Sequence, residues 1–559
     1  MRLADRYYKT DCISYADMEQ NCRIHLPERF NFGYDIVDQY ARLDPKKLAL
    51  LWCNDYNEER RFTFADMKKL SDRTANYFLS LGLKKGDVVM TTIKRRYQYW
   101  PITIALCKLG ITIIPATYQL TEKDVTYRVN AASVKMIISV DEPDLTDAIE
   151  ASCKNCPTLS YIALLDGKKR TGWLNFDEGV SQSSDVFSLD AESLPENKDI
   201  MLIYFTSGTT GMPKMAMHDY TYPLGHAMTA QYWHQTGEDD LHITVADTGW
   251  AKCSWGKIYG QWIVGTAQFV YDMEKFDAHK LAEKLEKYKV TSFCAPPTIY
   301  RFLIKSDLSK YDLSTLKHCA TAGEPLNAEV YRQFLSQFHV RIYEGCGQTE
   351  GAPIFANWKF DPPMPGSLGK PNPLYSVSLL SDNGSMCDPG EDGEICIRVG
   401  EGKPIGLFLG YYRNETLTKE CWHDGWYHTG DIAWMDEDGY YWFVGRSDDV
   451  IKSSGYRIGP FEMESALLTH PAVLESAISA APDPIRGQIV KATIVLSKGY
   501  VPSDTLKKEL QNHVKNITAP YKYPRIIEFV DELPKTLSGK IKRKQLRLEA
   551  EAKVHKFQQ

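Results

Sequence analysis

The sequence predicts an α/β protein: a large N-terminal domain of mostly parallel sheets covered by helices, including a β-rich subdomain, and a small α+β C-terminal domain. Helical patterns alternate with short apolar strands from about residue 35 to 180, which is typical of a parallel sheet with helices on its faces. The pattern then becomes largely β, and a small mixed module closes the chain. The expected domains are 1–446 and 447–559, with the β-rich subdomain at about 375–446.

The first half of the chain has clear start and stop signals. Thr63 is a suitable N-cap, and Asp66 suits the first turn of a helix that follows it. Residues 87–93 and 134–140 are apolar runs of strand length. Between them, residues 99–109 predict a helix whose proline falls in the first turn, where it is tolerated.

The second half repeats this alternation and then changes. A helix is expected over 279–288, because Leu281 and Leu285 lie four residues apart on one face. The turn Asp436–Gly439 sits between two aromatic-rich runs and predicts a hairpin. Further elements are expected as strands at 291–295 and 492–496 and a helix at 506–517.

Composition excludes several classes of protein. Among 559 residues, Lys and Arg number 66 and Asp and Glu 72, so the formal charge of −6 argues against nucleic acid as the main partner. No apolar run has the length of a membrane span, and the N-terminus lacks the apolar segment of a signal peptide. Thirteen scattered cysteines then indicate free thiols in a reducing cytoplasm, and the lone pair Cys153 and Cys156 lacks a second ligand pair for a metal.

A loop rich in glycine and hydroxyl side chains follows the strand 201–205. Glycines allow the backbone to approach a bulky anion, hydroxyls donate to phosphate oxygens, and a lysine supplies charge. The spacing does not match a Walker A loop, because Met212 and Pro213 separate the last glycine from the lysine. The residues expected to bind phosphate are Thr206, Ser207, Gly208, Thr209, Thr210, Gly211 and Lys214.

The stretch Tyr204–Lys214 resembles the signature loop of the adenylate-forming enzymes, which comprise acyl- and aryl-CoA synthetases, adenylation domains of peptide synthetases, and luciferases. The resemblance covers roughly residues 35–550 and is strongest to the medium-chain acyl-CoA synthetases of the butyrate–CoA ligase type. Further family motifs follow in order at Ala322–Pro325, Tyr343–Glu350, Tyr427–Asp431, Gly445–Lys452 and Pro534–Lys540.

The resemblance implies an enzyme that activates a carboxylic acid in two steps. The carboxylate attacks the α-phosphate of ATP and pyrophosphate leaves; the thiol of CoA then displaces AMP from the acyl-adenylate. The implied partners are a small carboxylic acid, ATP and CoA with Mg²⁺, without nucleic acid or membrane, and the sequence does not decide whether the chain forms a homo-oligomer. An aryl-acid CoA ligase, a luciferase-like oxygenase and a non-catalytic nucleotide-binding protein are the alternatives.

The resemblance also assigns catalytic roles. Lys540 would be the adenylation lysine that reaches between carboxylate and α-phosphate, and Thr349 would hydrogen-bond near that phosphate. Glu350 would hold Mg²⁺, since oxygen ligands suit this hard ion. Asp448 would be the hinge about which a mobile C-terminal domain rotates between the two steps.

Other residues would bind the nucleotide and CoA by the same resemblance. Asp431 would accept the ribose hydroxyls, and Arg446 would pair with ribose or phosphate. The remaining nucleotide-binding positions would be Gly323, Glu324, Pro325, Glu344, Gly345 and Gln348. The positions expected to contact CoA are Ser454, Gly455, Tyr456, Arg457, Arg486, Lys515, Tyr523 and Arg525.

The length of the acyl chain is expected to depend on Gly347. Acetate-type relatives carry a tryptophan at this position, so a glycine would extend the pocket. Each additional buried CH₂ contributes about 0.8 kcal/mol, which favours longer acids. We expect an acid of four to eight carbons, straight or branched. Trp250 and Trp255 are candidates to line or cap the pocket, and for Trp255 a place in the core is the alternative.

Overall fold

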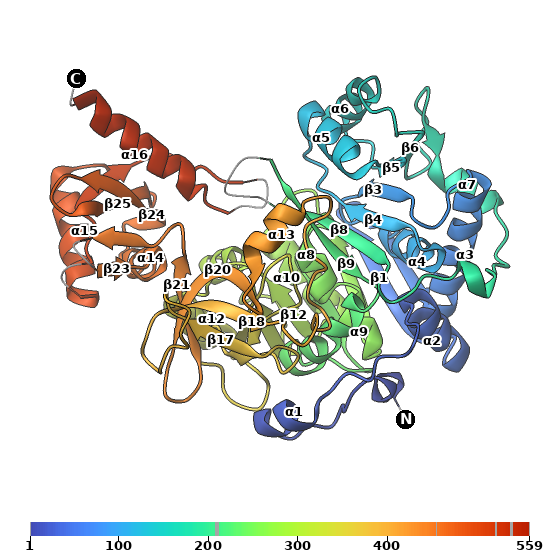
Figure 1. The fold of residues 1–559 in the computed structure, drawn as a ribbon, viewed down its shortest axis with the longest axis horizontal. Coiled ribbons are helices and arrows are strands. Elements are labelled where there is room, and N and C mark those ends of the chain that lie inside the picture. Colours follow the sequence, from blue (N-terminus) through green and yellow to red (C-terminus); the bar gives the residue numbers. More distant parts are fainter. Residues whose placement is uncertain (1, 207–211, 454–455, 520–521, 537–539, 558–559) are drawn as a thin grey trace.

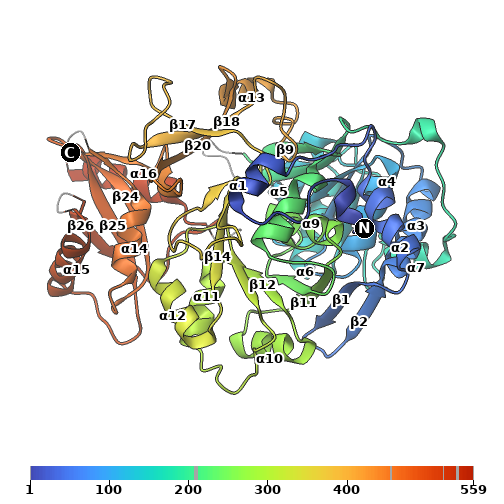
Figure 2. The ribbon, with the colours of Figure 1, turned by 90° about the horizontal axis from the view of Figure 1, so that it is seen from below.

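The computed structural model describes residues 2–206, 212–453, 456–519, 522–536 and 540–557. Helices and four sheets make up the chain, and the predicted fold class is confirmed. The C-terminal sheet and its helices lie at one end of the molecule, beside the β-rich part and away from the N-terminal helices (Figure 1). Figure 2 shows the same separation from below.

The first large sheet is parallel except for its last strand. Its central strands β3, β4 and β5 are buried along their whole length. In order, the strands are β7 (Leu174–Asn175), β6 (Tyr161–Leu164), β5 (Met136–Ser139), β3 (Val88–Thr92), β4 (Thr112–Pro115), β8 (Ile200–Thr206) and β9 (Lys214–Asp219). The helices of this region are α3 (Phe64–Ser80), α4 (Tyr99–Leu109), α5 (Glu122–Ala132), α6 (Pro143–Cys153) and α7 (Phe176–Gln182).

The second large sheet is parallel in its centre and antiparallel at both edges. In order, its strands are β16 (Lys370–Pro371), β15 (Phe355–Ala356), β14 (Ile342–Cys346), β13 (His318–Thr321), β12 (Ser292–Ala295), β10 (Leu241–Thr244), β11 (Ala267–Asp272), β1 (Leu48–Asn54) and β2 (Glu59–Thr63). Its helices are α8 (Ala251–Gly256), α9 (Tyr259–Ile263), α10 (Ala278–Tyr288), α11 (Pro297–Lys305) and α12 (Ala328–Phe338). The N-terminal helices are α1 (Tyr15–Asn21) and α2 (Asp38–Leu43), and short 3₁₀ or π turns lie at Leu3–Arg6, Gly33–Val37, Ala191–Ser193, Tyr222–His226 and Thr229–Trp233.

Local signals in the sequence are reproduced in the structure. The Thr63 side chain accepts from the Asp66 amide and the Asp66 carboxylate accepts from the Thr63 amide, so a capping box starts α3. The expected strands 87–93 and 134–140 and the helix 99–109 appear as β3, β5 and α4.

The β-rich part forms a third sheet that is antiparallel throughout its described pairs. The predicted hairpin is present, and Asp431 lies inside its first strand, where it pairs with Arg446 of the second. The elements are β17 (Val377–Leu380), β18 (Gly393–Arg398), α13 (Glu415–Cys421), β19 (Trp422–His423), β20 (Trp426–Met435) and β21 (Tyr441–Arg446).

The C-terminal sheet has a hydrophobic core of its own, built around Ile451, Met463, Ile478, Ile494 and Leu510. Its strands, in order, are β23 (Tyr456–Ile458), β22 (Ile451–Ser453), β25 (Gly487–Leu496) and β24 (Val473–Asp483), with β26 (Ile526–Phe529) parallel to β25. The helices are α14 (Pro460–Leu468), α15 (Asp504–Ile517) and α16 (Arg543–Phe557). The domain boundary at 446 remains a prediction.

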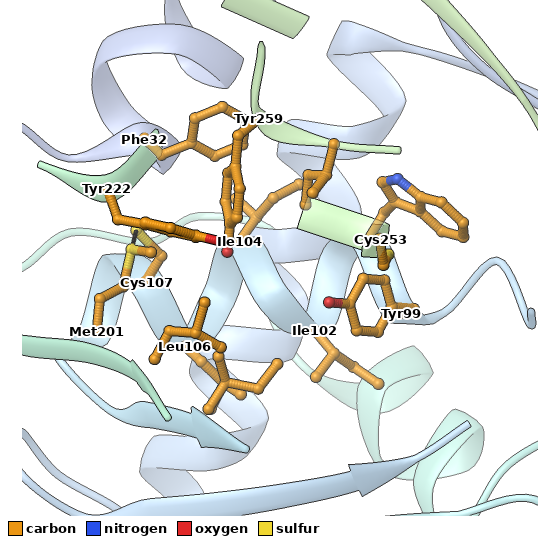
Figure 3. Close-up of a cluster of buried hydrophobic side chains, with 14 of the residues drawn as sticks. Phe32, Tyr99, Ile102, Ile104, Leu106, Cys107, Met201, Tyr222, Cys253 and Tyr259 are labelled. Carbon is orange, nitrogen blue, oxygen red and sulfur yellow. Dashed lines mark hydrogen bonds between the residues drawn. The ribbon is translucent and has the colours of Figure 1, made fainter. Parts of the chain in front are cut away.

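The main hydrophobic core surrounds α4. It packs this helix against residues from segments that are distant in the sequence. Figure 3 shows side chains of α4, including Ile102, Ile104 and Leu106, beside Tyr222, Cys253 and Tyr259. Every residue of α4 is buried, which explains why this helix lacks a polar face. All thirteen cysteines lie in the described part of the chain and are free thiols there. Among the described residues, no helix is both long and apolar enough to span a bilayer.

Candidate active site

A cavity of about 670 Å³ lies between the C-terminal part and the rest of the chain. Its walls come from the ends of strands β8, β13, β14 and β21, from β20, and from the segment around Lys540. Fourteen of the expected site residues line it: Thr206, Lys214, Gly323, Glu324, Pro325, Glu344, Gly345, Gly347, Gln348, Thr349, Glu350, Asp431, Arg446 and Lys540.

The other expected residues fall into two groups. Among the described residues, the cavity wall does not include Trp250, Asp448, Tyr456, Arg486, Lys515, Tyr523 and Arg525. Outside the described residues lie Ser207, Gly208, Thr209, Thr210, Gly211, Ser454, Gly455 and the side chain of Arg457.

A hydrogen-bonded group presents Asp431 to the cavity. Its Oδ1 accepts from Arg446 Nη1 at 3.0 Å, and its Oδ2 accepts from Gln348 Nε2 at 2.5 Å. Tyr427 Oη donates to Gln348 Oε1 at 2.8 Å and fixes the amide. Gly430 has φ +72°, and a Cβ there would lie 2.6 Å from Arg446 Nη2, so only glycine fits beside the arginine. Asp431 is therefore held in one orientation from both sides.

Glu350 and Thr349 are held by the strands beneath them. Tyr411 Oη donates to Glu350 Oε1 at 2.8 Å, and Lys214 Nζ lies 5.1 Å from the centre of the Tyr411 ring. His218 Nε2 lies 2.8 Å from the Thr349 carbonyl oxygen. Burial lowers the pKa of His218 to about 3, so its neutral ring donates this hydrogen bond through Nε2. A carboxylate and an ammonium group thus lie on the same wall.

The segment Gly323–Pro325 is fixed at its two ends by the buried Glu344 and the half-buried Lys252. Leu326 N donates to Glu344 Oε1 at 3.1 Å, and Lys252 Nζ donates to the Ala322 carbonyl at 2.6 Å. Burial of its carboxylate raises the pKa of Glu344 to about 8, and the hydrogen bond from Leu326 N opposes this rise. Glu344 therefore supports the backbone of this wall.

Lys540 lies on one of two paired antiparallel arms, residues 534–536 and 540–542, which are called the Lys540 hairpin below. Lys540 N donates to Thr536 Oγ1 at 3.1 Å, and Thr536 N donates to the Lys540 carbonyl at 2.7 Å. Lys535 and Ile541 form an antiparallel bridge at its base. The backbone nitrogen and oxygen of Lys540 are therefore fixed, while its exposed side chain borders the cavity.

Ion pairs anchor both ends of this hairpin. Lys535 Nζ contacts both Glu475 carboxylate oxygens at 2.8 and 2.9 Å. Arg543 Nη2 contacts both Glu464 oxygens at 2.8 and 2.7 Å, and Glu464 is only 7% exposed. Such a bidentate, desolvated pair fixes direction as well as distance.

The expected hinge residue lies next to the cavity but does not line it. Arg446 Nε is 3.8 Å from Asp448 Oδ1, and Arg547 Nη1 of α16 donates to the Asp448 carbonyl at 2.5 Å. The helix that follows Lys540 is thereby tied to the expected pivot. The structure is a single conformation, so rotation about Asp448 remains a prediction.

The expected CoA contacts Lys515, Tyr523 and Arg525 gather on the C-terminal part, apart from the cavity. Lys515 Nζ and the Arg525 guanidinium lie 4.0 and 4.8 Å from the centre of the Tyr523 ring, and Arg525 Nη1 donates to Tyr523 Oη at 2.8 Å. Arg486 N donates to Asp483 Oδ1 at 2.7 Å. Lys515, Tyr523 and Arg525 therefore form a compact basic group.

Gly347 lies where the cavity wall meets the core. A Cβ at this position would be 2.8 Å from Pro353 Cα and 3.2 Å from Trp255 Cη2. Trp255 is buried in the main core, as expected, yet its ring edge lies behind Gly347. Trp250 precedes α8, half-buried, and lies outside the cavity wall that the structure describes.

Sequence reasoning missed two groups that support the site. The first is Lys252, which lies in the segment with Trp250 and Trp255. A lysine between apolar residues, as here, is a sequence signal for a charged group enclosed by the fold. Burial lowers the pKa of Lys252, and the charge of Lys540 lowers it further, against the influence of Cys294 and Glu324. The pairing of Glu464 with Arg543 had no sequence signal, because the two residues are 79 positions apart.

Comparison with known proteins decides the family. The sequence profile of the AMP-binding enzyme family matches residues 37–412, and that of the AMP-binding enzyme C-terminal domain matches residues 462–540. The chain belongs to the AMP-binding enzyme family. The predicted identification as an AMP-forming acyl-CoA synthetase of the adenylate-forming group is confirmed.

Similar proteins of known name are acyl-coenzyme A synthetases. The mitochondrial acyl-coenzyme A synthetase ACSM3 of Mus musculus is 41% identical over 98% of this chain and 96% of its own length. The mitochondrial acyl-coenzyme A synthetase ACSM4 of Homo sapiens is 42% identical over 96% of this chain and 93% of its own. Both names place those relatives in mitochondria, whereas the cytoplasmic location of this chain remains a prediction.

Solved structures share the fold. The anthranilate CoA ligase AuaEII in complex with anthranoyl-AMP aligns with a TM-score of 0.86 at 29% identity, covering 95% of this chain and 99% of that one. An acyl-CoA synthetase of Brucella canis aligns with a TM-score of 0.71 at 31% identity, covering 95% of both chains. The architecture described above is therefore that of acyl-CoA and aryl-CoA ligases.

Proposed function

We propose that this AMP-forming acyl-CoA synthetase activates carboxylic acids of four to eight carbons, straight or branched, and that the cavity described above is its active site. The observation that carries the proposal is the meeting of two sets of residues in one cavity. The family motifs of the large N-terminal part face Lys540 of the C-terminal part across it.

The first step requires two anions to approach each other. The carboxylate oxygen attacks the α-phosphorus of ATP, and the bond from that phosphorus to the bridging oxygen breaks as pyrophosphate leaves. Lys540 would lie between the carboxylate and the α-phosphate, and Lys214 would meet the other phosphates. In a cavity that excludes water, such fixed charges stabilise the transition state more strongly than in bulk solvent.

The nucleotide would be held by the wall of the large part. Asp431 would accept from the ribose hydroxyls, Arg446 would contact ribose or phosphate, and Thr349 would hydrogen-bond near the α-phosphate. The backbone of Gly323–Pro325, fixed through Glu344 and Lys252, would border the adenine. Each assignment uses a side chain or backbone that the contacts above already orient.

The carboxylate of Glu350 fits Mg²⁺. Oxygen ligands suit this hard ion, and one carboxylate together with the phosphates of ATP is a usual way to bind it. Tyr411 engages Oε1, which fixes the direction of the carboxylate. Mg²⁺ bound to Glu350 would neutralise charge on the β- and γ-phosphates.

The second step transfers the acyl group to CoA. The thiolate attacks the acyl carbon, and the bond from that carbon to the oxygen shared with phosphorus breaks, so AMP leaves with that oxygen. We propose that the C-terminal part turns about Asp448 to bring CoA to the cavity. The basic group of Lys515, Tyr523 and Arg525, together with Tyr456 and Arg486, would then meet the CoA nucleotide.

Chain length would be set beside Gly347. The absence of a side chain there leaves Trp255 and Pro353 directly behind the wall, and any Cβ would crowd both. Aryl acids are the second candidate class, because the similar ligase of known structure named above is titled an anthranilate CoA ligase and holds anthranoyl-AMP.

Pyrophosphate release with a panel of C2–C10 and aryl acids tests the proposal. Highest turnover is expected between butyrate and octanoate, with acetate clearly lower. Acetate turnover equal to or above that of hexanoate would contradict the role of Gly347, and a preference for benzoate would select the aryl alternative. A panel in which every acid fails to release pyrophosphate would contradict the whole assignment.

A further inference from the structure

Three neighbouring side chains with metal-binding groups have no part in the proposed reaction, and two of them, Glu394 and His428, line the cavity. Glu394 and Cys396 belong to β18, and His428 belongs to β20. Cys396 pairs directly with His428 across the two strands, and Glu394 is two residues from Cys396 on the same strand. One ligand atom from each residue lies within 4.8 Å of the others.

The contacts converge on one ring nitrogen. His428 Nδ1 lies 2.9 Å from Glu394 Oε2 and 3.4 Å from Cys396 Sγ. A single ring nitrogen makes one good hydrogen bond, but here both a carboxylate and a thiol point at it. A cation bound by all three groups would satisfy them better. The buried Nε2 atom of the same ring has no hydrogen-bond partner among the described residues.

The spacing is close to that of tetrahedral zinc ligands. Usual zinc bond lengths imply separations of about 3.6 Å between nitrogen and sulfur and about 3.4 Å between nitrogen and oxygen. The observed nitrogen–sulfur distance of 3.4 Å agrees within about 0.2 Å. The nitrogen–oxygen distance of 2.9 Å would widen by about 0.5 Å when the ion binds.

Neighbouring groups hold the ligands in place. The His423 ring stacks on His428 with centres 3.9 Å apart and an angle of 11° between the planes. Gly430 N donates to Glu394 Oε1 at 2.8 Å, which leaves Oε2 directed at the histidine. Cys396 is buried, whereas Glu394 and His428 are half-buried, so solvent can reach a fourth position.

We propose that Glu394, Cys396 and His428 form a binding site for Zn²⁺, with water as the fourth ligand. A thiolate and an imidazole select zinc over Mg²⁺ and Ca²⁺, which prefer sites made of oxygen alone. The proposal does not depend on the acyl-CoA synthetase reaction and assigns the chain a second cation site, distinct from Glu350. Through Glu394, this site is linked by one hydrogen bond to Gly430, next to Asp431.

Cobalt titration tests the site with the full-length protein. After treatment with a chelator, CoCl₂ should bind with one equivalent giving a sulfur-to-cobalt charge-transfer band, and ZnCl₂ should displace it. Cys396→Ser should abolish the band while Cys387→Ser, which changes another cysteine of the β-rich part, retains it. Absence of the band in the unmodified protein, or its persistence in Cys396→Ser, would overturn the proposal.

A second variant keeps the test valid if the serine variant folds poorly. Glu394→Gln retains the thiol and the imidazole, so the band should remain while cobalt affinity falls by about tenfold or more. His428→Gln should weaken binding at least as much. Unchanged affinity in both variants would show that the metal binds elsewhere.

Discussion

The two sides of the cavity are built differently. The side proposed to bind the nucleotide consists of strand ends and short loops of the large part, where Asp431, Glu344 and Glu350 are held by hydrogen bonds from several neighbouring segments. The Lys540 side is one hairpin, held by two ion pairs to Glu464 and Glu475. This wall is fixed by the fold, whereas Lys540 belongs to the C-terminal part, which in the proposed mechanism would turn away between the two steps without disturbing the wall. This difference is what a two-step reaction in one cavity requires.

The largest expected effect separates the two steps at Lys540. Lys540→Ala should lower adenylation, measured as ATP–pyrophosphate exchange, by about 10²-fold or more, because one fixed charge at the transition state is lost. Thioester formation from supplied acyl-AMP should be nearly unchanged. Lys542→Ala, two residues away and exposed, is the matched control and should retain both activities. Equal loss of both steps in Lys540→Ala would contradict the division of the cavity into two sides.

The next effect concerns the ion pair that anchors the hairpin. Arg543→Gln should lower adenylation by about tenfold, because loosening a positioned group by a fraction of an ångström costs on the order of 1 kcal/mol or more. Partial recovery is expected in Arg543→Lys, which keeps the charge but loses the bidentate geometry. Asp504→Asn, which removes an exposed pair with Lys507 in the same part of the chain, should leave both steps unaffected. A drop in thioester formation as large as the drop in adenylation would indicate general unfolding instead of positioning.

A smaller effect, on the preference for acyl-chain length, is expected at Gly347 in the wall formed by the large part. Gly347→Ala should lower the ratio of kcat/KM for octanoate over acetate by about fourfold or more, since each CH₂ excluded costs about 0.8 kcal/mol. Gly351→Ala is the matched control, because its Cβ would meet neighbouring atoms only at 3.5 Å. A ratio that stays constant in Gly347→Ala would move the chain-length determinant away from Trp255 and Pro353.

The smallest effect is on stability and reports on Glu344. Its folded-state pKa of about 8 exceeds the ordinary value of 4.5, so the folded state binds the proton more tightly than the unfolded state. The stabilising contribution is fully present below about pH 4.5 and falls as pH rises toward 8. Glu344→Gln should therefore flatten the decline of the free energy of unfolding between pH 5 and about 8, and the exposed control Glu437→Gln should not. An unaltered slope in Glu344→Gln would mean that this carboxylate is not enclosed in solution.

The sequence was sufficient to predict elements and site residues that depend on a local pattern. Thr63 with Asp66 predicted the start of α3, and the motif residues predicted most of one wall of the cavity. It was insufficient where function depends on contacts between distant segments. Glu464 and Arg543 look like ordinary charges on separate helices until the fold pairs them.

The sequence also did not predict which side chains of a segment point toward the site. Trp250 was expected in the acyl pocket from its neighbourhood, but the strand-to-helix turn before α8 places it off the described cavity wall. The residue that does reach Gly347 is Trp255, which also belongs to the core. Spacing in the sequence indicates which segment approaches a site, and the backbone at the segment's end decides which side chain enters it.

The central claim is that a carboxylate oxygen becomes bonded to the α-phosphorus of ATP. The direct measurement uses hexanoate labelled with ¹⁸O in the carboxylate, together with ATP, Mg²⁺ and CoA, followed by mass spectrometry of the products. One ¹⁸O atom should appear in AMP for each hexanoyl-CoA formed. Unlabelled AMP, or label in inorganic phosphate with release of ADP, would contradict an acyl-adenylate intermediate.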